Sequence, residues 1–328
     1  MSRKVVICGA GFLGSGVARA LLSENLRLGL SSHRLPRVQI SSRHPEKIHG
    51  VLNASPSLDR TRLLSPRAVD ITKPETLNAA FAGADVIVSL VGIMNGSPED
   101  FERIQWKGVE NVAQAAKDAN SQLIHISAIG ADANSTIPYV RTKALGENAV
   151  LDKCPDATII RPSIVFGPGD GFFNRFARLS KYLPFMPVFG GGLTRFQPVF
   201  VGDIGRAVEI ISRNDEGIQK KFRGKIIEAG GPEVLTYREM METLLYYMDR
   251  RRPIISIPFA VGMAQGLILE RLPESLFTLT RAQVEQLKSD NIVSSPDSDQ
   301  VSFADLIAAH TPAHDTLRSV HDILPTYL

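Results

Sequence analysis

The sequence has few cysteines, little net charge and no long uninterrupted hydrophobic run. Only two of its 328 residues are cysteines, Cys8 and Cys154, so we expect no disulfide framework, no metal site and a reducing compartment. The formal net charge of +3 is carried by scattered Lys and Arg side chains, which argues against a nucleic-acid partner. The longest apolar stretch, residues 254–269, is too short and too often interrupted to span a bilayer.

We also expect no signal peptide, because the first charged residues run straight into an apolar segment at residue 5. What the sequence does contain is the composition of a soluble globular protein, with 44% hydrophobic and 22% charged residues. A chain of this length can bury a main core and a second, smaller lobe.

A glycine-rich motif follows the first apolar run and predicts a dinucleotide site. Residues 5–8 lead into Gly-x-Gly-x-x-Gly, and apolar residues then recur at helical spacing, which predicts a strand, a tight turn and a helix. Glycines let a pyrophosphate approach the backbone, and the helix N-terminus offers free N–H groups. A purely structural turn is the alternative. The residues expected to bind the cofactor here are Gly9, Gly11, Phe12, Leu13 and Gly14.

Short apolar runs alternate with helical patterns over the first two-thirds of the chain. We expect strands at residues 5–8, 38–41, 68–70, 86–91, 123–127 and 158–161, and helices at 14–23, 74–82, 101–119 and 139–153. Apolar strands separated by helices predict an α/β fold, a doubly wound parallel sheet of the Rossmann type with ligands at the carboxyl ends of its strands. The connections at 24–36 and 53–65 are expected to be surface loops.

The composition changes in the second half of the chain, where glycine-rich turns become frequent. We expect residues 1–165 to form an NAD(P)-binding Rossmann domain. Residues 166–328 are expected to supply pocket-lining loops, returning sheet segments and a small, mostly helical C-terminal lobe. Capping boxes at residues 236–239 and 280–283 predict the starts of two helices in that lobe.

The second predicted strand lacks the carboxylate that usually binds the ribose 2′-hydroxyl of NAD. It ends in Ser41, Ser42 and Arg43, and two hydroxyls with a guanidinium suit a 2′-phosphate better. We therefore expect NADP(H) rather than NAD(H), with Ser42 and Arg43 as contacts. The alternative is that Arg43 is a solvated loop residue.

Two further strand ends are expected to touch the cofactor. Asp70, at the end of the third strand, either accepts a hydrogen bond from the adenine amino group or caps the helix that begins near Thr72. Leu90 and Val91, at the end of the fourth strand, are expected beside the cofactor ribose.

Three residues extend the hypothesis from binding to chemistry. Lys143 lies four residues after Tyr139, so on a helix the ammonium and the phenol share a face. A nearby cation favours phenolate, and we expect it to lower the pKa of Tyr139. Ser127, at the end of the fifth strand, is placed to hold a substrate oxygen.

This set, together with residues 161–168, resembles the extended branch of the short-chain dehydrogenase/reductase superfamily. The resemblance implies that Tyr139 and Lys143 are catalytic and that Lys143 also holds the nicotinamide ribose. It further implies that Pro162 lies near the nicotinamide and that Ser127 polarises the substrate.

More segments are similar to one atypical subgroup of that superfamily, at residues 126–132, 141–147, 172–176, 190–199 and 279–284. The subgroup contains the NAD(P)H-binding accessory subunit of mitochondrial complex I, its bacterial relatives and fungal proteins of coenzyme Q biosynthesis. The resemblance implies a mitochondrial protein on the matrix side of the inner membrane, with complex I subunits or coenzyme Q biosynthesis proteins as partners and a mainly structural or regulatory nucleotide. The subgroup usually has Gly in place of Cys8, which implies a first turn shifted onto Gly9.

Other classes of function stay open at this point. One alternative is a working NAD(P)-dependent oxidoreductase or sugar-nucleotide epimerase/dehydratase that uses Tyr139 and Lys143. Another is a sensor whose affinity for a partner follows the ratio of NADPH to NADP. A cytoplasmic location is the alternative to a mitochondrial one.

Three features of the second half each allow two interpretations. The apolar helix expected at 257–272 is either buried core or a surface that faces quinone or membrane. Phe172, Phe173 and Phe176 either line a substrate pocket or pack in a core. Arg195 either binds a substrate phosphate or carboxylate, or forms a surface salt bridge.

Overall fold

The computed structural model describes residues 2–23, 35–213, 215–270, 275–276, 278–294, 301–310 and 316–328. They form two compact units that alternate along the chain. The first unit comprises Met1–Pro162, Val201–Ala229 and Pro296–Thr316, and the second comprises Ser163–Phe200, Gly230–Ser295 and Leu317–Leu328. Except for residues 35 and 36, the connection expected at 24–36 lies outside the described residues.

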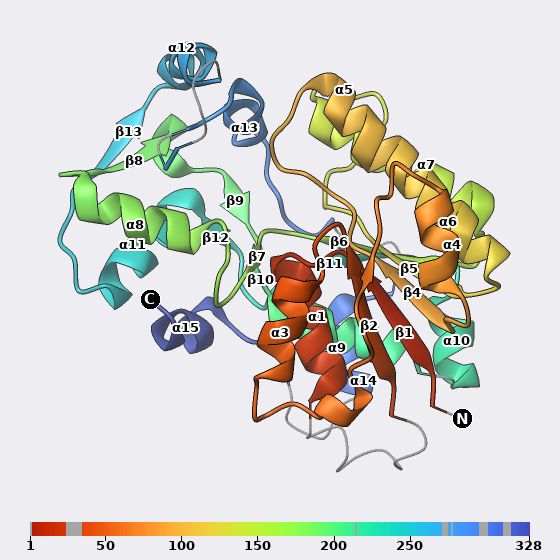
Figure 1. The fold of residues 1–328 in the computed structure, drawn as a ribbon. Helices are drawn as coiled ribbons and strands as arrows, with labels where there is room; N and C mark the ends of the chain where they lie inside the picture. Colours follow the sequence, from red (N-terminus) through yellow and green to blue (C-terminus); the bar gives the residue numbers. More distant parts are fainter. Residues whose placement is uncertain are drawn as a thin grey trace. The chain divides into compact units, whose positions relative to one another are not determined.

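The first unit is built on a seven-stranded sheet in the order β11-β6-β5-β4-β1-β2-β3 (Figure 1). Its strands are β1 (Lys4–Cys8), β2 (Arg37–Ser42), β3 (Arg67–Ala68), β4 (Val86–Ser89), β5 (Gln122–Ile126), β6 (Thr158–Pro162) and β11 (Ile226–Ala229). All neighbouring pairs are parallel. The predicted doubly wound parallel sheet is thus confirmed, and the strand order reverses between β1 and β4, where such sheets bind their ligands.

Helices cover both faces of this sheet, because its apolar strands are buried on both sides. The helices are α1 (Phe12–Leu22), α3 (Glu46–Asn53), α4 (Glu75–Phe81), α5 (Pro98–Phe101), α6 (Val109–Asp118), α7 (Pro138–Lys153), α9 (Val201–Ile211), α10 (Glu216–Phe222) and α14 (Phe303–His310). Helices α4, α6 and α7 pack together, and α9 packs against both α1 and α14 (Figure 1). The helix expected at 101–119 is interrupted by a π-helical turn, Glu102–Gly108.

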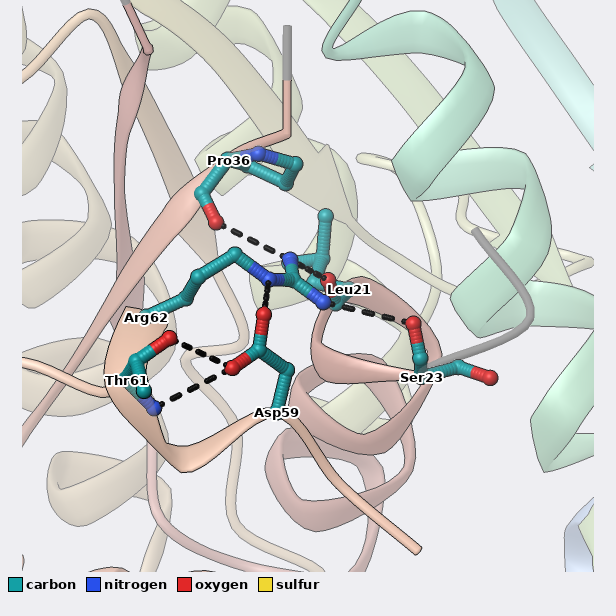
Figure 2. Close-up of polar contacts among 6 residues, drawn as sticks. All are labelled: Leu21, Ser23, Pro36, Asp59, Thr61 and Arg62. Carbon is teal, nitrogen blue, oxygen red and sulfur yellow. Dashed lines mark hydrogen bonds and ion pairs between the residues drawn. The ribbon is translucent and has the colours of Figure 1, made fainter. Parts of the chain in front are cut away.

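The connection expected to be a surface loop at 53–65 is irregular and exposed at most of its positions, but Leu58, Asp59 and Arg62 are buried. After α3 the chain forms a 3-10 turn, Arg60–Arg62, in which Arg62 is only 7% exposed. Figure 2 shows its guanidinium beside Asp59 and the backbone carbonyls of Leu21, Ser23 and Pro36. Arg62 Nε lies 2.7 Å from Asp59 Oδ2, and Nη1 donates to Leu21 O at 2.6 Å. The burial follows because the last carbonyls of a helix need donors, which Arg62 supplies to α1.

The second unit contains short paired strands and helices. The strand pairs are β7 (Val165–Phe166) with β10 (Val199–Phe200), β8 (Met186–Phe189) with β13 (Ile254–Ile257), and β9 (Arg195–Phe196) with β12 (Leu235–Thr236). The helices are α8 (Phe173–Tyr182), α11 (Tyr237–Tyr247), α12 (Phe259–Leu269), α13 (Arg281–Gln286) and α15 (Val320–Ile323). Both predicted capping boxes are confirmed, at the starts of α11 and α13.

The structure decides two of the open interpretations of this unit, those of the three phenylalanines and of Arg195. Phe172 packs edge-on against both Phe173 and Phe176, and all three belong to the aromatic core around α8 and α11. Arg195 forms the surface ion pair, since its Nη2 lies 2.7 Å from Asp290 Oδ2.

Helix α12 lies at the surface of its unit, so the expectation of a buried core helix is wrong. It ends at Leu269, and two of its apolar side chains, Val261 and Leu267, are 52% and 42% exposed. Its sequence is apolar on all sides, and burial of one side leaves the others in solvent. Within the described ranges, no helix is both long and apolar enough to cross a membrane.

Candidate nucleotide-binding site

The glycine motif forms a tight turn between β1 and α1. Gly9 has a φ of +140°, a conformation that L side chains rarely adopt. A Cβ on Gly14 would lie 2.0 Å from the carbonyl oxygen of Gly9, so only glycine lets the helix approach the strand this closely. A Cβ on Gly11 would meet nothing within 4 Å. The turn is therefore closed by two of its glycines and open at the third.

The open side of the turn is the N-terminus of α1. Gly11 is the N-cap and no side chain caps the helix, which leaves the N–H groups of Phe12, Leu13 and Gly14 without intrahelical partners. Unpartnered N–H groups at the positive end of a helix dipole bind anions. This cradle fits the diphosphate of a dinucleotide, and its residues are those expected from the motif.

The ends of β2 and β3 follow β1 in the strand order, on one side of the glycine turn. The N–H of Gly9 donates to Ser41 O at 2.8 Å, which joins the turn to the end of β2, where Ser42 is half-buried and Arg43 is exposed. Asp70 does not cap a helix, because α4 begins at Glu75 and its N-cap, Pro74, has no side-chain hydrogen bond. Its Oδ1 instead closes a local turn, accepting from the N–H of Thr72 at 3.0 Å and from the Thr72 hydroxyl at 2.7 Å. These bonds to Thr72 lower the pKa of the Asp70 carboxyl.

Lys143 lies buried behind the end of β4. Its Nζ donates to Val91 O at 3.2 Å and to Ile126 O at 3.3 Å, the carbonyls that follow β4 and end β5. Burial lowers the pKa of Lys143 to about 8, against the opposing effect of Glu147 one turn along α7. Leu90 is adjacent to the glycine turn, because a Cβ on Gly9 would lie 2.9 Å from the Cβ of Leu90.

Tyr139 lies on the first turn of α7, where its ring packs edge-on against Phe101 with 6.2 Å between centroids. Burial raises the pKa of Tyr139 to about 12. The expectation that Lys143 lowers this pKa is therefore wrong. The physical reason is that desolvation of the phenolate dominates, while the Lys143 ammonium donates to backbone carbonyls.

Ser127 follows β5 directly and is 4% exposed. Its N–H donates to Ile160 O at 2.8 Å, and Ile129 N–H donates to Pro162 O at 3.0 Å, so this loop is held at the end of β6. Among the described residues, the Ser127 hydroxyl has no hydrogen-bond partner. A buried hydroxyl without a partner is unusual and is available to a ligand oxygen.

Gln105 is a site residue that the sequence did not reveal. It lies in the π-helical turn, is almost fully buried, and donates from Nε2 to the Thr142 hydroxyl at 3.1 Å. Its Oε1 accepts from the N–H of Ile93 at 3.3 Å, which positions the loop after β4. The only available signal was a glutamine inside an otherwise helical pattern, although π-helical turns occur frequently at functional sites.

A half-buried ion pair lies next to Lys143, one turn further along α7. Arg161 on β6 donates to both carboxylate oxygens of Glu147, from Nε at 2.9 Å and from Nη2 at 2.5 Å. Because Glu147 already has a bidentate partner, it acts on Lys143 only as a nearby negative charge.

Residues 5–230 match the family described as "NAD dependent epimerase/dehydratase family". The chain belongs to that family. The matched region includes the glycine turn, Ser127, Tyr139 and Lys143. Membership of the epimerase/dehydratase family also confirms the resemblance to the extended short-chain dehydrogenases.

Two relatives of this epimerase/dehydratase family member have different functions by name. The mitochondrial "NADH dehydrogenase (ubiquinone) 1 alpha subcomplex subunit 9" of Arabidopsis thaliana is 31% identical over 254 residues, 74% of this chain and 61% of that protein. The ceramide reductase of Caulobacter vibrioides is 30% identical over 188 residues, 56% of this chain and 53% of that protein. The chain thus spans less than two thirds of the length of either relative.

A solved structure is similar in fold to nearly the whole of this chain. The Citrobacter triphenylmethane reductase, complexed with NADP(H), superposes with a TM-score of 0.69 over 99% of this chain and 100% of that one. At 18% identity this likeness shows the fold alone. The neighbour and the family description together establish an NAD(P)-binding fold.

Proposed function

We propose that this chain binds NAD(P)H as a firmly held structural or regulatory ligand, on the matrix side of the mitochondrial inner membrane. The observation that carries nucleotide binding is the open space beside Gly11 at the N-terminus of α1. The proposed partners are complex I subunits or coenzyme Q biosynthesis proteins. Similarity to the Arabidopsis complex I subunit supports the first of these, and the exposed apolar side chains of α12 support contact with a membrane surface.

Each residue of the site has a proposed role toward the nucleotide. The N–H groups around Gly11 hold the diphosphate, and the strand ends hold the sugars and rings. The residues proposed to bind are Gly9, Gly11, Phe12, Leu13 and Gly14 for the diphosphate, Ser42, Arg43 and Asp70 for the adenosine half, and Leu90, Val91, Lys143 and Pro162 for the nicotinamide half.

A structural or regulatory role is favoured by the state of the two residues that would do acid–base chemistry. A bound NAD(P)H supplies hydride chemistry. A phenol with a pKa of about 12 keeps its proton at neutral pH, so almost none of Tyr139 is present as the phenolate that would accept a proton. Lys143 is directed at the carbonyls of Val91 and Ile126, where it joins the ends of two strands.

We expect the natively purified protein to retain NADPH or NADH, and we expect the Tyr139→Phe variant to retain it equally. Released nucleotide is identified by mass spectrometry, and Tyr182→Phe, an exposed tyrosine on α8, is the matched control. Failure of both nucleotides to co-purify or to raise the melting temperature would contradict the binding proposal. Native gels test the proposed partners. If the protein migrates with neither complex I nor the coenzyme Q biosynthesis proteins, the partner proposal is contradicted and the nucleotide-binding proposal is not.

A working oxidoreductase is the second candidate function. It is favoured by the buried Ser127 hydroxyl, which a substrate oxygen would satisfy, and by similarity to the Caulobacter ceramide reductase. In that case Ser127, Tyr139 and Lys143 are catalytic, and Tyr139→Phe lowers turnover by roughly 10²–10⁴-fold. The two candidates therefore differ in what this one substitution does.

We further propose that the chain prefers NADP(H) to NAD(H). Arg43 is exposed and makes no ion pair within the described part of the chain, and β2 ends without a carboxylate. Arg43→Ala is expected to weaken NADPH binding by about tenfold and to leave NADH binding unchanged, because only the 2′-phosphate uses the guanidinium. Titrations with both nucleotides measure this, with Arg37→Ala at the other end of β2 as the control. Equal affinities for NADPH and NADH in the unmutated chain would refute it.

A further inference from the structure

The second unit carries a surface hollow of about 620 Å³ with four arginines in its lining. We shall call it the arginine hollow; its arginines are Arg238 on α11 and Arg250, Arg251 and Arg252 in the turn that leads to β13. We propose that the arginine hollow binds a phosphate-bearing ligand. This proposal is independent of the nucleotide site, which is built from residues of the first unit.

The backbone holds three of these arginines in a defined turn. Helix α11 ends at Tyr247, and just beyond its C-cap lies a left-handed residue, Asp249, with a φ of +49°. The N–H of Arg250 then donates to Leu245 O at 2.9 Å, which closes the helix end and reverses the chain. On the far side, Pro253 O accepts from the N–H of Met186, and β13 pairs with β8 (Figure 1). The turn is therefore anchored at both ends.

Three of the four guanidinium groups are oriented by backbone carbonyls and retain free donors. Arg250 Nη1 and Arg252 Nε both lie 3.4 Å from the same carbonyl oxygen, Ser180 O, and Arg238 Nε donates to Gly191 O at 3.1 Å. Arg251 is exposed. Each guanidinium has five N–H donors, so most of them remain available to a ligand in the hollow.

The charge in the hollow is not neutralised. Glu242 and Asp249 also belong to its lining, so the four arginines leave a surplus of two positive charges. In the described part of the chain none of these six side chains forms an ion pair, whereas Arg161, Arg195 and Arg213 each pair with a carboxylate. Like charges held together in a concave site raise the potential there and attract an anion.

The chemistry of the lining favours phosphate over a simple carboxylate. Several forked donors from neighbouring residues match the three oxygens of a phosphoryl group, which accepts paired hydrogen bonds from more than one side. Tyr246, which is 77% exposed, and the apolar side chains of Leu245 and Ile254 also contribute to the lining. The ligand class is thus an organic phosphate with an apolar or aromatic portion, either a soluble phosphometabolite or the headgroup of an anionic phospholipid.

The test uses the full chain with two probes, inorganic pyrophosphate in calorimetric titrations and vesicles of phosphatidylcholine with or without phosphatidylglycerol in flotation. Arg251→Gln combined with Arg252→Gln is expected to weaken binding at least tenfold. The control, Arg60→Gln with Arg67→Gln, removes the same charge from exposed positions of the first unit and is expected to change nothing. Pyrophosphate bound at the glycine turn would be insensitive to both pairs of substitutions.

The two sources of phosphate give different results. Binding of pyrophosphate but not of vesicles supports a soluble ligand, and binding of phosphatidylglycerol vesicles supports a lipid headgroup. Arg251→Lys with Arg252→Lys keeps the positive charge but removes the forked guanidinium donors. A loss of affinity smaller than that of the glutamine pair supports paired hydrogen bonding to the phosphate. The proposal is overturned if neither probe binds, or if the glutamine pair binds both probes as tightly as the unmutated chain while its melting temperature is unchanged.

Discussion

Replacing Arg62 with alanine is expected to lower the free energy of unfolding by about 3–5 kcal/mol, the range for removing one partner of a buried ion pair. Asp59, 4% exposed, would keep its charge without the guanidinium that lies 2.7 Å away. The carbonyls of Leu21, Ser23 and Pro36 would lose their donor as well. Because two of these carbonyls belong to the end of α1, the substitution also releases the helix whose other end forms the glycine turn.

Urea unfolding followed by circular dichroism measures this loss. Arg60→Ala is the matched control, since Arg60 lies in the same 3-10 turn with an exposed side chain, and its expected effect is within about 0.5 kcal/mol. The double variant Arg62→Met with Asp59→Leu removes both charges and is expected to recover part of the stability. A loss below about 1 kcal/mol for Arg62→Ala would show that the pair is not buried in solution.

The features of the site that could be predicted from the sequence are those that depend on residues close together in the chain. The glycine motif at residues 9–14 specifies its own turn, because Gly9 and Gly14 are neighbours in both sequence and space. The spacing of Tyr139 and Lys143 likewise placed both side chains on α7. The parallel sheet followed from alternating apolar runs, since strands buried on both faces need no polar positions.

What could not be predicted depends on partners far apart in the chain. In the sequence Arg62 looks like an ordinary loop arginine, and its burial depends on α1 and the segment at Pro36 packing around it. Gln105 likewise looks like an ordinary helical glutamine, and its role depends on contacts with Ile93 and Thr142. The pKa of Tyr139 was expected to fall because a cation is nearby in sequence, yet it rises because tertiary packing desolvates the ring. Burial, unlike spacing, is a property of the assembled fold.

Substitutions at Gly11 and Gly14 are expected to separate the fold of the turn from its function. Gly14→Ala forces a Cβ to within 2.0 Å of Gly9 O, so α1 must move from β1, and we expect a loss of roughly 3 kcal/mol in stability together with loss of nucleotide binding. Gly11→Ala meets no protein atom, and its φ of −96° suits alanine. Its cost in stability is expected to stay below about 1 kcal/mol.

The Gly11→Ala substitution is expected to impair nucleotide binding rather than folding. The added methyl group enters the space proposed for the diphosphate, so affinity for NADPH and NADH is expected to fall at least tenfold while the fold persists. Gly50→Ala, in the exposed middle of α3 where a Cβ also meets nothing within 4 Å, is the matched control and is expected to leave binding unchanged. Fluorescence titration and thermal unfolding of the three variants measure both quantities. If Gly11→Ala binds both nucleotides as tightly as the unmutated chain, then the diphosphate does not lie against this turn, because no other glycine of the motif offers it room.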